Sequence, residues 1–190
     1  ADSVMADFVE RFSGASLVSR GEPFVTLARS IVGQQISVKA ADSVWARLSM
    51  AIPVMTPAAV LACDTASLRA CGLSARKVEY LGDLATHFSA GKIHLGRWAL
   101  MSDAEIIAEL TAVRGIGVWT VEMFLIFHEL RPDVFPLDDI GLQKAVALHY
   151  FQGERPSRKA LAECGERWRP WRSVATWYLW RSLDPVPVEY

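Results

Sequence analysis

One stretch of the chain, residues 110–146, combines a glycine-rich turn, a tryptophan and a pair of carboxylates. The turn contains Gly115-Ile116-Gly117 and comes directly before a strongly apolar segment with Trp119 near its start. A Gly-x-Gly turn frees backbone N–H groups to point outward, and the N-terminus of a following helix adds partial positive charge. This pattern predicts a site for a phosphate group.

The carboxylates, Asp138 and Asp139, lie a short loop beyond the apolar segment and open another helix that begins near Ile140. On spacing alone, either aspartate could serve only as the cap of that helix, which is a frequent role for aspartate. The alternative is that one of the two carboxylates acts in acid–base or electrostatic chemistry. A phosphate site and a carboxylate on one scaffold indicate chemistry on a nucleic acid.

The composition is typical of a folded globular protein. Of the 190 residues, 52% are hydrophobic, which argues against disorder and is enough for one sizeable core or two small lobes. No apolar run approaches the roughly 18 residues that a membrane-spanning helix needs. The N-terminal residues mix acids with single apolar side chains, so we expect no secretory signal there.

The formal net charge of −1 does not by itself indicate a nucleic-acid-binding protein, but the distribution of charge matters more than its total. Basic residues outnumber acidic ones between residues 152 and 181. This segment contains three acidic residues, Glu154, Glu163 and Glu166, and seven basic residues: Arg155, Arg158, Lys159, Arg167, Arg169, Arg172 and Arg181. The surplus could form one face of a DNA-binding groove, and the alternative is an ordinary solvated helix surface.

Neither the cysteines nor the histidines have the spacing of a metal or disulfide site. The three cysteines, Cys63, Cys71 and Cys164, form no CxxC pair, and a reducing compartment is the simplest explanation. The four histidines lack the short ligand spacings of a zinc site. The sequence therefore predicts neither a disulfide framework nor a zinc centre.

Helical periodicity dominates the chain. Apolar residues recur at intervals of three and four from Phe24 to Val32 and from Val38 to Leu48. Capping signals mark the starts of further helices at Thr56, Ser74 and Ser102. No stretch shows the alternation of apolar and polar residues that is typical of a half-buried strand, so the sequence predicts an all-α fold.

Four segments carry a further pattern: Ala28 to Ser37, Gly72 to Lys77, Leu110 to Asp139, and Arg167 to Ser173. In this order and at this spacing they resemble the helix-hairpin-helix DNA glycosylases, a superfamily of base-excision repair enzymes. Within that superfamily the chain is most similar to the 3-methyladenine DNA glycosylase II branch. The hairpin of the family corresponds to residues Leu110 to Gly117, and the family's catalytic aspartate corresponds to Asp139.

The resemblance implies two helical lobes with a cleft between them. Residues 23–131 would form a six-helix bundle that ends with the hairpin and its following helix. Residues 1–22 and 132–190 would form the second lobe. The boundary coincides with Pro132, which cannot continue the preceding helix. Asp139 would then lie just past the crossover, at the cleft.

The resemblance assigns catalysis to Asp139 and leaves helix capping to Asp138. Hydrolysis of an N-glycosidic bond develops positive charge on the deoxyribose, which a fixed carboxylate beside C1′ stabilises. Bifunctional members of the superfamily have a lysine where this chain has Trp119, and an indole cannot be that nucleophile. We therefore predict a monofunctional glycosylase that removes alkylated purines, of the 3-methyladenine and 7-methylguanine type, and leaves an abasic site.

Two other interpretations stay open. A nonenzymatic helix-hairpin-helix protein would bind DNA and retain the base, so base release from methylated duplex DNA separates it from an enzyme. A bifunctional glycosylase/lyase could use another lysine, such as Lys144, and would form a protein–DNA adduct that borohydride traps.

The resemblance also assigns residues to the substrate. Trp119 and Trp180 correspond to pocket-lining tryptophans, whose π faces attract cationic methylated purines. Met123 occupies a position where the bacterial member of this branch has a tyrosine that lines the pocket, so we expect the pocket to be less aromatic on that side. Gln34 and Gln35 lie in the segment whose family counterpart enters the DNA, where a side chain fills the gap left by the flipped nucleotide.

The remaining expectations concern the hairpin and its partners. The residues expected to contact phosphates through the hairpin and the following turn are Gly115, Gly117, Val118 and Thr120. An alkali ion, Na⁺ or K⁺, would lie on the backbone carbonyls of Thr111, Val113 and Ile116. We expect that no cofactor is required. We also expect no iron–sulfur cluster, because some relatives carry four cysteines near the C-terminus and this chain has only Cys164 there. The expected partner is double-stranded DNA that contains alkylated bases. We expect the protein to be a monomer with no membrane partner. We expect it in the cytoplasm if the protein is bacterial and in the nucleus if it is eukaryotic.

Overall fold

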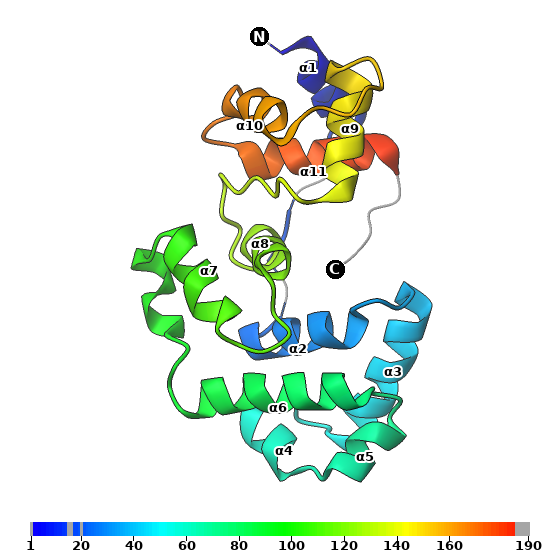
Figure 1. Cartoon of the computed structure of the whole chain (residues 1–190), viewed down its shortest axis with the longest axis vertical. Coiled ribbons are helices and arrows are strands. Elements are labelled where there is room, and N and C mark those ends of the chain that lie inside the picture. The colour runs from blue at the N-terminus through cyan, green and yellow to red at the C-terminus, as the bar shows by residue number, and fades with distance from the viewer. Residues whose placement is uncertain (1, 15–16, 20, 185–190) are drawn as a thin grey trace. The chain divides into compact units, whose positions relative to one another are not determined.

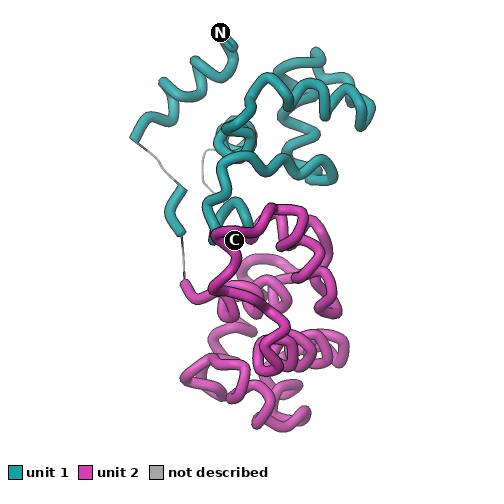
Figure 2. Tube along the Cα trace, turned by 90° about the vertical axis from the view of Figure 1, so that its left-hand side faces the viewer, with its two compact units in different colours: residues 1–19, 125–190 teal, residues 20–124 magenta. Residues whose placement is uncertain are grey.

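The computed structural model describes residues 2–14, 17–19 and 21–184, and these residues form α-helices, a 3-10 helix and no β-strand (Figure 1). The all-α fold class is therefore confirmed. The chain divides into two compact units: unit 1 contains Ala1–Ser19 and Leu125–Tyr190, and unit 2 contains Arg20–Phe124 (Figure 2). Among the described residues, no helix has the length and apolarity needed to cross a membrane.

Unit 2 is built around α2 (Pro23–Gly33), which packs against α6 (Ala75–Ser89) and α3 (Val38–Ala51). The side chains of Leu27 and Ile31 on α2 are completely buried, as the sequence periodicity predicts. The other elements of this unit are α4 (Pro57–Ala62), α5 (Thr65–Ala70), η1 (Leu95–Leu100), α7 (Asp103–Thr111) and the start of α8 (Val118–Phe127).

The predicted helix starts of unit 2 are confirmed. The Ser74 hydroxyl accepts the backbone N–H of Lys77 and caps α6. Ser102 and Glu105 form a capping box at α7, in which each side chain bonds the backbone of the other residue. Thr56 caps α4, whose first residue is proline. Each cap satisfies an N–H group that the first helical turn leaves without an intrahelical partner.

Unit 1 contains α1 (Ser3–Arg11), α9 (Ile140–Tyr150), α10 (Arg158–Glu166) and α11 (Arg172–Leu183). Its core includes the buried residues Phe8, Phe135, Leu142, Ala145, Val146, Leu161, Cys164, Trp168, Ala175 and Leu179. Asp2 connects α1 to this core: its carboxylate caps α1 and accepts the Tyr150 hydroxyl and the Trp168 indole N–H, each at 3.0 Å.

Helix α8 contributes to both units. It has no polar face, and Phe124 contacts Trp98 in unit 2 while Phe127 stacks on Trp180 in unit 1. The compact units therefore divide within this helix, at Phe124 and Leu125, whereas the sequence placed the lobe boundary after residue 131. Of the predicted second lobe, residues 1, 15, 16, 20 and 185–190 lie outside the described residues.

Candidate functional site

Asp139 is the residue directly before the first turn of α9, and it caps that helix. Its backbone is extended, with φ −71° and ψ 121°, and its Oδ1 accepts the N–H of Leu142 at 2.6 Å. The prediction that Asp138 would be the cap is therefore wrong. The capping carboxylate must belong to the residue at the N-cap position, because only that backbone brings the carboxyl to the third N–H of the helix.

The side chain of Asp138 instead lies at the surface. It pairs with Arg158 of α10, and both side chains are more than half exposed, at 68% and 62%. Surface ion pairs of this type contribute little to stability, about 0–1 kcal/mol. Of the two adjacent carboxylates, only Asp139 is enclosed by protein, with an exposed fraction of 8%.

Trp180 of α11 holds the same carboxylate oxygen of Asp139. Its indole Nε1 donates to Oδ1 at 2.7 Å, and its ring stacks on Phe127 at a centroid distance of 5.7 Å. Gly141 makes this approach possible, because a Cβ there would lie 3.0 Å from the indole and 3.1 Å from the carboxylate. Asp139 and Trp180, both predicted site residues, are thus in direct contact.

The hairpin turn between α7 and α8 has a backbone that requires glycine at Gly115. Its φ is +84°, and a Cβ would collide with the ring of Tyr80 on α6. The N–H of Arg114 donates to Oδ2 of Asp83 at 2.8 Å, which fixes the turn from a second side. Gly117 differs, because a Cβ there would meet open space.

The residues around the start of α8 differ in exposure. Gly117, Val118 and Trp119 are exposed, the last with an exposed fraction of 39%, whereas Thr120 is buried at 8%. Met123 lies one helical turn beyond Trp119 and is 6% exposed. Backbone N–H groups at a helix N-terminus can bind a phosphate, and the phosphate site at this turn stays a prediction.

The two glutamines after α2 have different environments. The Gln34 carboxamide donates from Nε2 to the carbonyl of Gly115 at 2.8 Å and so connects the end of α2 to the hairpin. Gln35 is exposed and has a φ of +59°, an uncommon conformation for a residue other than glycine. Lys77 donates to the Val32 carbonyl at 2.7 Å, and burial lowers the pKa of this lysine.

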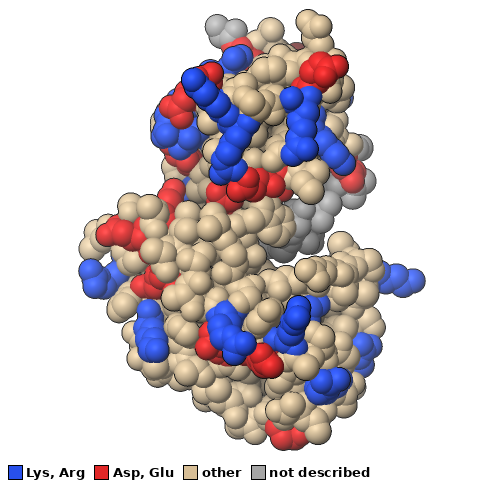
Figure 3. Space-filling view, viewed as in Figure 1, with Lys and Arg blue, Asp and Glu red and all other residues tan. Residues whose placement is uncertain are grey.

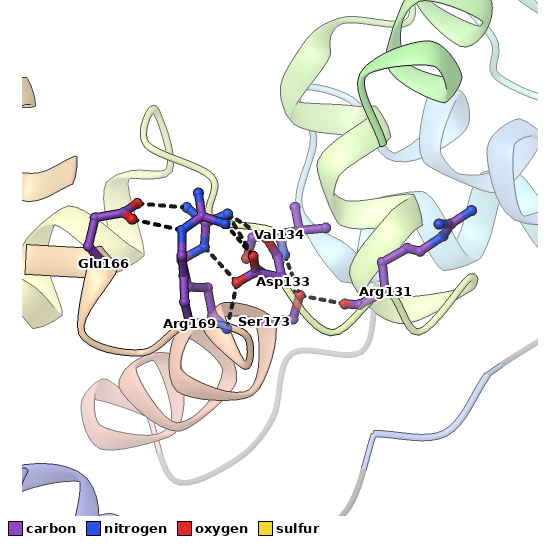
Figure 4. Close-up of polar contacts among 7 residues, drawn as sticks. Arg131, Asp133, Val134, Glu166, Arg169 and Ser173 are labelled. Carbon is purple, nitrogen blue, oxygen red and sulfur yellow. Dashed lines mark hydrogen bonds and ion pairs between the residues drawn. The ribbon is translucent and has the colours of Figure 1, made fainter. Parts of the chain in front are cut away.

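The basic segment near the C-terminus is largely paired within unit 1. Arg172 and Arg169 both bind the carboxylate of Asp133, and Arg169 also binds Glu166 (Figure 4). On the face drawn in Figure 3, basic and acidic side chains are interspersed. Two of the seven basic residues, Arg169 and Arg172, are therefore bound to an acid that lies outside the basic segment.

The described residues contain no group of three or more histidines, cysteines or acids that could hold a metal ion. All three cysteines are free thiols. The hairpin carbonyls predicted to hold an alkali ion include that of Val113, which accepts the N–H of Ile116 at 3.2 Å. A carbonyl oxygen has two lone pairs, so this bond leaves capacity for a cation.

Comparison with known proteins gives consistent matches. Residues 28–170 match the family described as HhH-GPD superfamily base excision DNA repair protein. The chain is 34% identical to DNA-3-methyladenine glycosylase 1 of Schizosaccharomyces pombe, over 87% of this chain and 74% of that protein. Against two Bacillus subtilis relatives, it spans only 64% of their length.

Solved structures show the same fold. A DNA-3-methyladenine glycosidase from Bacillus halodurans aligns with a TM-score of 0.89 and 34% identity, covering 96% of this chain and 85% of that one. The 3-methyladenine DNA glycosylase Mag1 of Schizosaccharomyces pombe, in complex with abasic DNA, aligns with a TM-score of 0.79 and 30% identity. That alignment covers 98% of this chain and 93% of the other.

Proposed function

Because the chain belongs to the HhH-GPD superfamily of base excision DNA repair proteins, we propose that it is a monofunctional DNA glycosylase. It binds duplex DNA as a monomer, turns an alkylated purine out of the helix and hydrolyses the N-glycosidic bond. The products are the free base and an abasic site. The names of the relatives support a substrate of the 3-methyladenine type.

One observation carries the proposal: the carboxylate of Asp139 is enclosed and held by two hydrogen bonds on one oxygen. As the base departs, the deoxyribose acquires oxocarbenium character, and a fixed negative charge beside C1′ stabilises it. The same carboxylate orients a water molecule and accepts its proton, while the hydroxide adds to C1′. The departing purine keeps the electron pair of the broken C–N bond.

The residue at position 119 supports the monofunctional assignment. In the superfamily's bifunctional members this position provides a lysine that attacks C1′ and forms an imine, and here it is Trp119. The exposed indole of Trp119 and the indole of Trp180 instead offer π faces to a cationic purine. Met123 adds an apolar, polarisable contact.

DNA binding rests on groups of unit 2. Backbone N–H groups around Gly117, Val118 and Thr120 bind a phosphate, a contact that is independent of base sequence. Gln35 enters the stack at the gap left by the flipped nucleotide. No cofactor is required; an alkali ion on the carbonyls of Thr111, Val113 and Ile116 would add positive charge against the same phosphate.

The test uses one end-labelled duplex with a single 7-methylguanine. The expected result is release of free base by the wild-type protein, with strand cleavage only after alkali treatment and no adduct after borohydride reduction. Duplex binding without base release would identify a nonenzymatic binding protein instead. Strand cleavage without alkali, together with a trapped adduct, would indicate a lyase that uses another lysine such as Lys144.

A further inference from the structure

The loop that leads from α8 to the candidate catalytic residue is fixed at its start by two adjacent residues of α11. Arg172 donates from Nε to Oδ1 of Asp133 at 2.7 Å and from its second terminal nitrogen to Oδ2 at 3.1 Å. The Ser173 hydroxyl donates to the Arg131 carbonyl and accepts the N–H of Val134 at 2.9 Å (Figure 4).

The pair of Asp133 and Arg172 is shielded from solvent. The exposed fractions of these side chains are 24% and 16%, against 68% and 62% for the surface pair of Asp138 and Arg158. Burial alone would raise the pKa of Asp133, but the hydrogen bonds and charge of Arg172 lower it below the ordinary value. Two hydrogen bonds from one guanidinium group, shielded from solvent, restrict both the orientation of the Asp133 carboxylate and its distance from Arg172.

The same helix fixes the other end of the loop. Trp180 lies about two turns beyond Ser173 on α11, so both residues face the same side of the helix. Its indole donates to Oδ1 of Asp139 at 2.7 Å. Between the two ends, Val134 and Phe135 are buried in unit 1, which leaves this part of the loop little freedom. One rigid helix thus sets where the loop begins and where the carboxylate points.

We propose that Arg172, through Asp133, is a positioning residue for the Asp139 carboxylate. The polar partners of Arg172 are Asp133 and Glu166, and its effect on Asp139 is transmitted by the loop that it anchors. This inference rests on the proposed glycosylase function, because it assigns to Asp139 the reaction whose rate is measured. Displacement of a reacting group by about 1 Å lowers a rate by about a hundredfold, so a modest loosening is measurable.

The experiment compares wild type with Arg172→Lys, which keeps the charge but not the planar fork, and with Asp133→Asn, which keeps the shape but not the charge. Two quantities are measured: the single-turnover rate of base release at saturating protein, and the dissociation constant for the same duplex. A third readout does not depend on activity. It is the indole N–H resonance of Trp180 in ¹⁵N-tryptophan-labelled protein, assigned by its absence in Trp180→Phe.

The matched control is Arg158→Gln, which removes an ion pair to the same loop from the protein surface. We expect Arg172→Lys and Asp133→Asn to slow base release by about ten- to a hundredfold, with the dissociation constant within twofold of wild type. The Trp180 resonance should move in both variants and stay in place in the control.

The inference stands if, in at least one folded variant, release slows and the resonance moves. It is overturned if either readout stays at its wild-type value in both variants. A wild-type protein that releases no base contradicts the proposed function, and the resonance still reports whether Arg172 orients the Asp139 contact.

Discussion

The indole of Trp180 donates a hydrogen bond to the carboxylate of Asp139 at 2.7 Å, although the two residues are 41 positions apart in the sequence. The backbone N–H of Leu142, in the first turn of α9, donates to the same oxygen at 2.6 Å. A carboxylate held in this way by a side chain and a helix N-terminus has a defined orientation. Its direction is therefore set before any substrate binds.

The first prediction separates the two roles of Trp180. Trp180→Phe keeps an aromatic face but removes the donor to Asp139. A hydrogen bond to a charged group contributes about 1.5–3 kcal/mol, so we expect base release to slow by about ten- to a hundredfold. Trp180→Ala should lose the stacking face as well and be slower still. Release by Trp180→Phe at the wild-type rate would mean that the hydrogen bond has no part in catalysis.

The second prediction concerns the two hairpin glycines. Gly115→Ala should lower the free energy of unfolding by about 1–3 kcal/mol, because it adds strain at a positive φ and a collision with Tyr80. Gly117→Leu should leave stability nearly unchanged, since its Cβ meets open space. It should instead weaken binding to damaged and undamaged duplex alike. Denaturant unfolding and duplex titrations distinguish the two effects, and a loss confined to damaged DNA would contradict phosphate binding at this turn.

The third prediction uses the different environments of the adjacent glutamines. Gln34→Ala removes the bond to the Gly115 carbonyl and should lower thermal stability together with affinity for any duplex. Gln35→Ala removes an exposed side chain, so stability should stay near wild type. Its base release should fall, because the gap in the stack is no longer filled. Melting temperatures and single-turnover rates test the pair, and identical effects of both substitutions would argue against this division.

The fourth prediction is a pH dependence at Asp2. Burial opposes ionisation of this carboxyl, but hydrogen bonds from Trp168, Met5, Tyr150 and Val4 lower its pKa below 3.8. A pKa that is lower in the folded state adds stability above the unfolded pKa, and this stability is lost as the pH falls through the folded pKa. Asp2→Asn should therefore be less stable than wild type at pH 7. The difference should shrink as the pH is lowered below 3.8, and a difference that is constant with pH would count against the assignment.

The sequence was sufficient for the features that depend on neighbouring residues. The caps at Thr56, Ser74 and Ser102 and the buried face of α2 follow from spacing within one or two helical turns. Asp138 and Asp139 could not be distinguished as the cap, because the cap depends on which residue has the extended backbone before α9.

The sequence could not give the contacts between distant elements. Asp133 and Arg172 are 39 positions apart, and a run of basic residues near the C-terminus looks the same whether its members face solvent or a partly buried acid. The division of α8 between two units was also hidden, since a helix that is apolar on all sides does not show which side meets which partner.

The most direct test of the account is Asp139→Asn, measured on duplex DNA with a single 7-methylguanine. Asparagine keeps the size of the side chain and an oxygen that can accept from Trp180 and the helix, so the fold and duplex affinity should be preserved. The negative charge beside C1′ is lost, and the single-turnover rate of base release should fall nearly to background. Base release by Asp139→Asn within a few fold of wild type would contradict the central claim.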